Sequence, residues 1–121
     1  MATEPDFDWS QAESLLGDDP HQVPEDMAAI VLELIQSGNE RFQELKTKNP
    51  AEERKGISAL AHQLRGSLLN FGFTGVGAIL LRIEKQEYVP EEYQSLLDQA
   101  QTIFELSKKM LAERFPSAHI A

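Results

Sequence analysis

A histidine with unusual neighbours lies in the segment 61–67, whose sequence is AHQLRGS. If this segment is helical, two residues correspond to about 200° of rotation, so His62 points away from the apolar Leu64. Arg65 and Gly66 then follow His62 one turn later on the outward face. A neutral imidazole keeps a nucleophilic lone pair, a guanidinium offsets negative charge, and a glycine leaves space. Periodicity leaves two interpretations open, a nucleophilic site or a surface histidine beside an incidental glycine.

Other residues that could do chemistry predict less. The chain has no cysteine, which excludes disulfides, thiolate metal sites and cysteine nucleophiles. His21, His62 and His119 are too far apart in the sequence to predict a metal site. The glycine-rich segment 72–77 precedes an expected helix, as a phosphate loop would, but it lacks a preceding strand and the usual lysine. We interpret it as a turn between two helices.

Length and charge restrict the class of protein. The 121 residues predict one domain, 1–121, with a single buried core. The net charge is −9, and it is concentrated in residues 1–26, which hold eight acidic residues and no lysine or arginine. A chain this acidic is not expected to bind nucleic acid, which requires a basic face. The acidic N-terminal segment itself is interpreted as a solvated polar leader.

The same composition bears on location. The longest apolar run, residues 27–32, is far too short to span a membrane, and the N-terminus lacks the basic region of a secretory signal. The absence of cysteine fits a reducing compartment. We therefore expect a cytoplasmic protein with no membrane association. Met1 and an expected frayed tail at 117–121 suggest a free-standing chain.

Hydrophobic periodicity predicts helices and no strands. Asp8 can cap a short helix that runs to Leu16 and ends at Gly17, and Pro24 begins a long helix that reaches about Lys48. Three further helices are expected to begin at the following positions: Asn49-Pro50, Thr74 (as the cap) and Pro90.

Four amphipathic helices joined by short loops predict an all-α fold, an antiparallel four-helix bundle with an additional short N-terminal helix. The predicted divisions are an acidic N-terminal segment at 1–23, the bundle at about 24–115 and a short C-terminal tail at 116–121.

Several apolar residues receive specific expectations. The stripe of the first long helix should bury Ile30 among its neighbours, and Gly38 within it marks either a close helix contact or a weak point. Phe7, Trp9 and Leu15 are expected to seal one end of the bundle, with a partner-docking patch as the alternative.

The motifs together resemble a known family. Residues 61–67 (AHQLRGS), 70–73 (NFGF) and 80–84 (LLRIE) resemble the histidine-containing phosphotransfer (HPt) domain family, whose signature is A-H-x-L-K-G-S followed by a hydrophobic-glycine step. Residues 15–20 (LLGDDP) look like the N-terminal lead-in of that family. The resemblance covers almost the whole chain. It implies a four-helix bundle that relays phosphoryl groups between response-regulator aspartates through an exposed histidine.

The resemblance implies a role for each site residue. His62 would accept the phosphoryl group on Nε2, and Glu84 would accept a hydrogen bond from Nδ1–H. The less favoured alternative for Glu84 is an ordinary surface acid. Arg65 stands where the family usually has lysine and would offset the phosphoryl charge. The face expected to dock a receiver domain has these residues: Ser58, Gly66 and Leu69.

The resemblance also implies partners. The chain would be a monomeric phosphocarrier rather than an enzyme, exchanging phosphoryl groups with response-regulator receiver domains and a hybrid histidine kinase. It would bind no cofactor, because the Mg²⁺ would sit on the partner receiver. Phe71-Gly72-Phe73 also resembles the phosphotransfer domain of chemotaxis histidine kinases, in which case a kinase would act on His62 directly. Two rivals stay open: an HPt-like module that binds a receiver or kinase without phosphoryl turnover, and a structural bundle without a signalling role.

Overall fold

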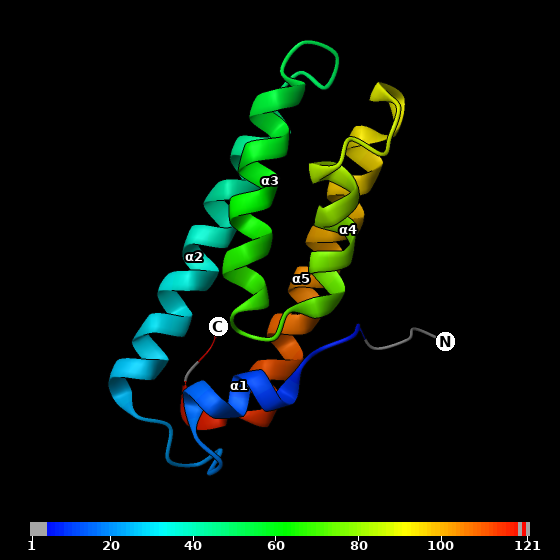
Figure 1. Cartoon of the computed structure of the whole chain (residues 1–121). Coiled ribbons are helices and arrows are strands. Elements are labelled where there is room, and N and C mark those ends of the chain that lie inside the picture. The colour runs from blue at the N-terminus through cyan, green and yellow to red at the C-terminus, as the bar shows by residue number, and fades with distance from the viewer. Residues whose placement is uncertain (1–4, 119, 121) are drawn as a thin grey trace.

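The computed structural model describes residues 5–118 and 120. Four long helices form an up-and-down bundle in which neighbours along the chain run in opposite directions (Figure 1). No strand occurs among the described residues, so the predicted all-α four-helix bundle with a short N-terminal helix is confirmed. None of the helices in this part of the chain is long and apolar enough to cross a membrane. The bounds are α1 Trp9–Leu16, α2 Glu25–Thr47, α3 Arg54–Leu69, α4 Thr74–Glu84 and α5 Tyr93–Arg114, with 3₁₀ turns at Pro90–Glu92 and Pro116–Ala118.

The centre of the core is aromatic. Phe104 of α5 packs against Phe42 of α2 and Phe73 before α4, with ring centroids 5.5 and 5.6 Å away. A Cβ atom on Gly38 would lie 3.1 Å from Cζ of Phe104, so the glycine lets α2 approach this ring. Gly38 therefore marks a close helix contact and not a weak point.

One expectation for α2 was wrong. Ile30 is 43% exposed, whereas Ala28 and Ile35 are buried. The buried residues of α2 follow one narrow stripe at steps of three and four, and Ile30 lies beside that stripe.

The start of α3 also differs from the prediction. Asn49 and Pro50 belong to a turn, and the helix begins at Arg54. The Asn49 side chain accepts the N–H of Ala51 at 2.9 Å, while the Asn49 N–H donates to the Glu53 carboxylate at 2.7 Å. These local bonds stabilise a turn instead of a first helical turn, as asparagine side chains commonly do. Similarly, Thr74 is the first residue of α4 and makes no capping hydrogen bond.

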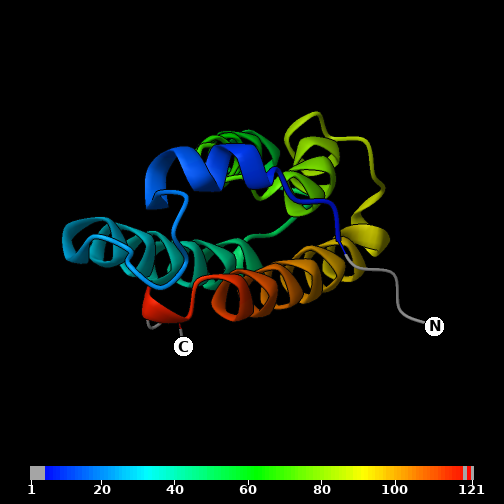
Figure 2. The same ribbon diagram turned by 90° about the horizontal axis from the view of Figure 1, so that it is seen from below.

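The N-terminal segment is packed on the bundle. Asp8 caps α1 by accepting the N–H of Gln11, and Gly17 ends the helix with φ of 91°, both as predicted. The backbone before α1 pairs with the α3–α4 turn, since Asp8 N–H donates to the Gly72 carbonyl at 2.8 Å. Figure 2 shows α1 lying across one end of the long helices. The segment is therefore docked and not a free leader from position 5 onward, although its acidic side chains, such as Asp6, Asp18 and Asp19, are solvated as expected.

Aromatic side chains close this end of the bundle, as expected for Phe7 and Trp9. The Phe7 ring lies 4.4 Å from that of Trp9, and both pack against the core. Arg114 of α5 covers the outer face of Trp9, with its guanidinium carbon 4.5 Å from the ring centroid. Leu15 is only half-buried, and Leu16 is the leucine that enters the core.

The expected frayed tail is docked over its described residues. Ala118 is buried, and the Ser117 hydroxyl donates to the Pro20 carbonyl at 2.9 Å while accepting the Val23 N–H at 3.0 Å. The chain here is held by the segment that links α1 to α2, because those backbone groups have no helical partner.

The opposite faces of α3 predict opposite mutational effects. Leu64 is 1% exposed, so Leu64→Ala should lower the free energy of unfolding by about 2–5 kcal/mol. The His62 side chain is 66% exposed, so His62→Gln should change it by less than about 0.5 kcal/mol. Urea unfolding of the two variants measures both values. A large loss for His62→Gln would contradict the orientation of α3.

Candidate functional site

The site is centred on His62, in the middle of α3. Ala61 and Leu64 on either side of it are buried in the bundle, which turns the imidazole outward. The sequence-based orientation of this helix is therefore confirmed.

Glu84, the last residue of α4, reaches across to this histidine. Its Oε2 lies 3.1 Å from Nδ1 of His62, and its Oε1 accepts a hydrogen bond from Nε of Arg65 at 2.9 Å. The carboxylate is thus shared by two side chains of α3, and its own side chain is only 19% exposed. Glu84 is not an ordinary surface acid.

Electrostatics favour the ionised form of Glu84. The hydrogen bond from Arg65 lowers the pKa of this carboxyl below its ordinary value of 4.5, against the opposing effect of desolvation, and His62 lowers it further. An ionised carboxylate only accepts hydrogen bonds, so the His62 nitrogen that faces it must carry a proton. In the neutral imidazole this leaves Nε2 with its lone pair.

Arg65 is held beside the histidine by the same carboxylate. Its side chain is 23% exposed, and its hydrogen bond to Glu84 uses only the Nε–H. The guanidinium has four further N–H donors on its terminal nitrogens. Arg65 therefore can hold Glu84 and still present positive charge to an anion at the site.

The three residues expected to dock a receiver lie in different environments. Gly66 is exposed beside His62, and a Cβ atom added to it would meet nothing within 4 Å. Ser58 is half-buried and its hydroxyl donates to the main-chain carbonyl of Glu84. Leu69 is half-buried and turned toward α4, where its Cδ2 lies 2.8 Å from the position of a Cβ on Gly77. Only Gly66 is purely a surface position, because the other two help to pack α3 on α4.

A shallow groove runs along α3 past the histidine. Four of its residues were not identified from the sequence. Lys55 and Ala59 share the helical face of His62 at steps of seven and three and were open to prediction from that face, and Gln63 is its neighbour in sequence. The fourth, Gln86, follows α4 in sequence, and only the packing of α4 on α3 brings it there. The groove has these lining residues: Lys55, Ser58, Ala59, His62, Gln63, Glu84 and Gln86.

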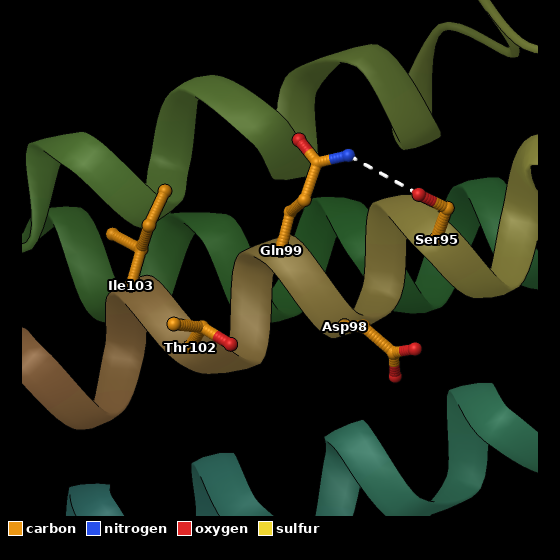
Figure 3. A pocket seen from close by; sticks show the side chains of 5 residues that line it. All are labelled: Ser95, Asp98, Gln99, Thr102 and Ile103. Atoms are coloured by element: carbon orange, nitrogen blue, oxygen red, sulfur yellow. Dashed lines mark hydrogen bonds between the residues drawn. The ribbon is translucent and has the colours of Figure 1, made fainter.

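A second shallow pocket lies on α5, away from this histidine (Figure 3). Its polar side chains include Ser95, whose hydroxyl accepts a hydrogen bond from the Gln99 amide at 3.3 Å, and Asp98 points away from that pair. Among the described residues no group of three or more His, Asp or Glu side chains is placed to hold a metal ion. His119 lies outside the described residues.

A helical bundle that presents an exposed histidine in mid-helix, with a carboxylate hydrogen-bonded to its Nδ1, has the architecture of a phosphocarrier module. The family model of the Hpt domain matches residues 29–113, and the chain belongs to this family, as the sequence resemblance predicted. No curated protein and no solved structure matches the chain significantly. Membership places the protein in phosphotransfer signalling, and Hpt domains are phosphocarrier modules that interact with receiver domains and kinases.

The lowered pKa of Glu84 predicts a specific pH dependence. A carboxyl whose pKa is lower in the folded state stabilises the fold above its unfolded pKa, and this contribution is lost as the pH falls through the folded pKa. Glu84→Gln removes the titrating group, so it should lose less free energy of unfolding than the wild type between neutral pH and about pH 3.

Urea unfolding at a series of pH values measures this difference. Glu13→Gln, which removes an exposed ion pair with Arg114, controls for the loss of one surface carboxylate. Equal acid sensitivity of Glu84→Gln and the wild type would contradict the assignment.

Proposed function

We propose that the protein is a relay intermediate, in which His62 accepts a phosphoryl group from the aspartate of one receiver domain and passes it to the aspartate of another. The observation that carries this proposal is the contact between Glu84 and Nδ1 of His62, which leaves Nε2 as the exposed nucleophile. The rest of the site is consistent with it, since Gly66 leaves open space beside the ring.

The transfer follows from the tautomer. The Nε2 lone pair attacks phosphorus, a P–N bond forms, and the P–O bond to the receiver's aspartate breaks with its electron pair remaining on the carboxylate oxygen. The proton on Nδ1 stays in place, so the ring becomes a phosphorylated imidazolium. Glu84 stabilises this positive charge, and Arg65 offsets the negative charge of the phosphoryl group. In the second transfer a carboxylate oxygen of the acceptor receiver's aspartate attacks phosphorus and forms a P–O bond, while the P–N bond breaks and its electrons return to Nε2.

This chain supplies the nucleophile and a docking surface. The partner receiver would supply Mg²⁺ and the phosphorylated aspartate, and a hybrid histidine kinase would be the original source of the phosphoryl group. The proposal includes a monomeric carrier located in the cytoplasm and without kinase activity of its own. The membership of the chain in the Hpt family supports the carrier role, because Hpt domains are phosphocarriers rather than catalysts.

His62→Gln should abolish phosphoryl acceptance, because glutamine offers no ring nitrogen as a nucleophile. The protein is incubated with a phosphorylated receiver and Mg²⁺, and the label is located by mass spectrometry under alkaline conditions, which preserve phosphohistidine. His21→Gln is the matched control, since His21 is exposed and outside the groove, and it should be labelled like the wild type.

Undiminished label in His62→Gln would contradict the assignment of the nucleophile. Stable receiver binding by the wild type with no label from several receivers would instead support a module that binds without phosphoryl turnover.

Gly66 tests the steric part of the proposal. Gly66→Ala should fold with equal or slightly greater stability, by up to about 1 kcal/mol, because alanine is the better helix former and meets no neighbour. Gly66→Gln should fold but transfer poorly, since its side chain would stand between His62 and the receiver.

The control is Gly56→Gln, the same substitution in the same helix at a position with equally open space outside the groove. It should transfer like the wild type, as judged by the labelling rate and by thermal unfolding of each variant. Normal transfer by a folded Gly66→Gln protein would exclude the steric role.

A further inference from the structure

Gln86, two residues after the end of α4, has a costly backbone conformation. Gln86 has φ of 59°, and among the described residues it is the non-glycine residue with positive φ. The Gln86 N–H donates to the Ile83 carbonyl at 3.1 Å and the Glu87 N–H donates to the Arg82 carbonyl at 2.9 Å. This is the Schellman arrangement, in which the left-handed position is usually glycine. Glycine would adopt this conformation at lower cost, so the glutamine side chain is expected to contribute an interaction of its own.

Arg54, the first residue of α3, holds Gln86 at two points. Its Nε donates to the side-chain Oε1 at 3.0 Å, and its Nη2 donates to the main-chain carbonyl at 3.2 Å. The guanidinium also covers the ring of buried Tyr88, 4.9 Å from the centroid. Glycine at position 86 would keep the carbonyl but lose the side-chain hydrogen bond.

These contacts continue a row of attachments between α3 and the end of α4. Arg54 at the start of α3 binds Gln86, and Ser58 one turn later donates to the Glu84 carbonyl. Further along the helix, His62 and Arg65 contact the Glu84 carboxylate. The spacings of four, four and three place the four residues on one face of the helix. Glu84 is thus attached by its backbone and by its carboxylate, and Gln86 adds a further attachment just after α4 ends.

We propose that Arg54 and Gln86 are positioning residues for the histidine: they fix the C-terminal end of α4 on α3 and so keep the Glu84 carboxylate on Nδ1 of His62. Neither residue touches the reacting atoms. Their effect reaches His62 through Glu84, two residues before Gln86. The inference rests on the proposed function, because the tautomer of His62 matters only if this residue accepts a phosphoryl group. The contact between Glu84 and Nδ1 of His62 itself exists without any receiver.

Three substitutions at Gln86 separate positioning from simple stability. Gln86→Gly and Gln86→Asn both relieve the left-handed strain. Both keep the main-chain carbonyl, but neither keeps a side-chain acceptor that reaches Nε of Arg54, because glycine has no side chain and asparagine is one methylene shorter. Gln86→Glu keeps the acceptor and adds charge to the bond with Arg54. If residue 86 served only to end the helix, the glycine and asparagine variants would match or exceed the wild type in both stability and reactivity.

The first measurement asks which nitrogen of the His62 ring carries the proton in the unphosphorylated protein. Long-range ¹H–¹⁵N correlation spectra at neutral pH report this directly. We expect the fraction protonated at Nδ1 to fall in Gln86→Gly and Gln86→Asn and to be retained in Gln86→Glu. Thermal unfolding of all three should occur no lower than in the wild type. Loss of the Nδ1 proton without loss of stability is the signature of positioning.

The second measurement is the rate of His62 phosphorylation by phosphoramidate, in which the P–N bond of the reagent breaks, ammonia leaves and a P–N bond to Nε2 forms. We expect the glycine and asparagine variants to react about threefold to tenfold more slowly, the effect of weakening one hydrogen bond. The glutamate variant should react at the rate of the wild type. Arg54→Ala combined with Gln86→Gly should be no slower than Arg54→Ala alone, since both remove the same contact.

Two results would overturn the proposal: unchanged Nδ1 protonation and phosphoramidate rate in Gln86→Gly, or the same losses in Gln86→Glu as in Gln86→Gly. The result is independent of the relay itself. If no receiver labels the wild type while Nδ1 protonation still follows the Gln86 variants, the proposed function fails and the positioning role stands.

Discussion

The shared carboxylate of Glu84 is the interaction on which the rest of the site depends. It lies between an imidazole and a guanidinium, 3.1 Å from one and 2.9 Å from the other, and it comes from a different helix than both. Because Arg65 keeps this carboxyl ionised, the nitrogen that faces it must hold the proton. The carboxylate at Nδ1 thereby leaves the lone pair on Nε2, the ring nitrogen that reacts.

Such an arrangement requires two helices to be held at a fixed distance. Gly77 of α4 permits this approach, since a Cβ atom there would lie 2.8 Å from Leu69 of α3. Deeper in the bundle, Gly38 plays the same part for α2 against Phe104. The small residues let backbones approach, and the aromatic core then fills the space between them. A shift of about 1 Å between the two helices would take Glu84 out of hydrogen-bonding distance of the histidine.

The N-terminal segment contributes to the same rigidity from the other end of α3. The backbone before α1 pairs with the turn between α3 and α4, where Gly72 has φ of 94° and a Cβ atom would meet the Asp8 carbonyl at 2.5 Å. The two ends of the α3–α4 pair are therefore both fixed, one by this segment and one by Arg54 and Gln86. The histidine lies between these two attachments, so its side chain is exposed while the helix that carries it is held in place.

The sequence by itself determined the helical periods, the outward direction of His62 and the presence of a cation and a glycine beside it, because these depend only on spacing within one helix. It also predicted the cap at Asp8 and the stop at Gly17, which are local interactions. It was wrong about the start of α3, where Asn49 forms a turn with Glu53, and about Ile30, whose burial depends on which side of α2 faces its neighbours. The contact of Glu84 with His62 was expected only by family resemblance, and the contact of Gln86 with Arg54 was not expected at all. Both were decided by the tertiary structure, because residues more than twenty positions apart meet only when α4 packs on α3.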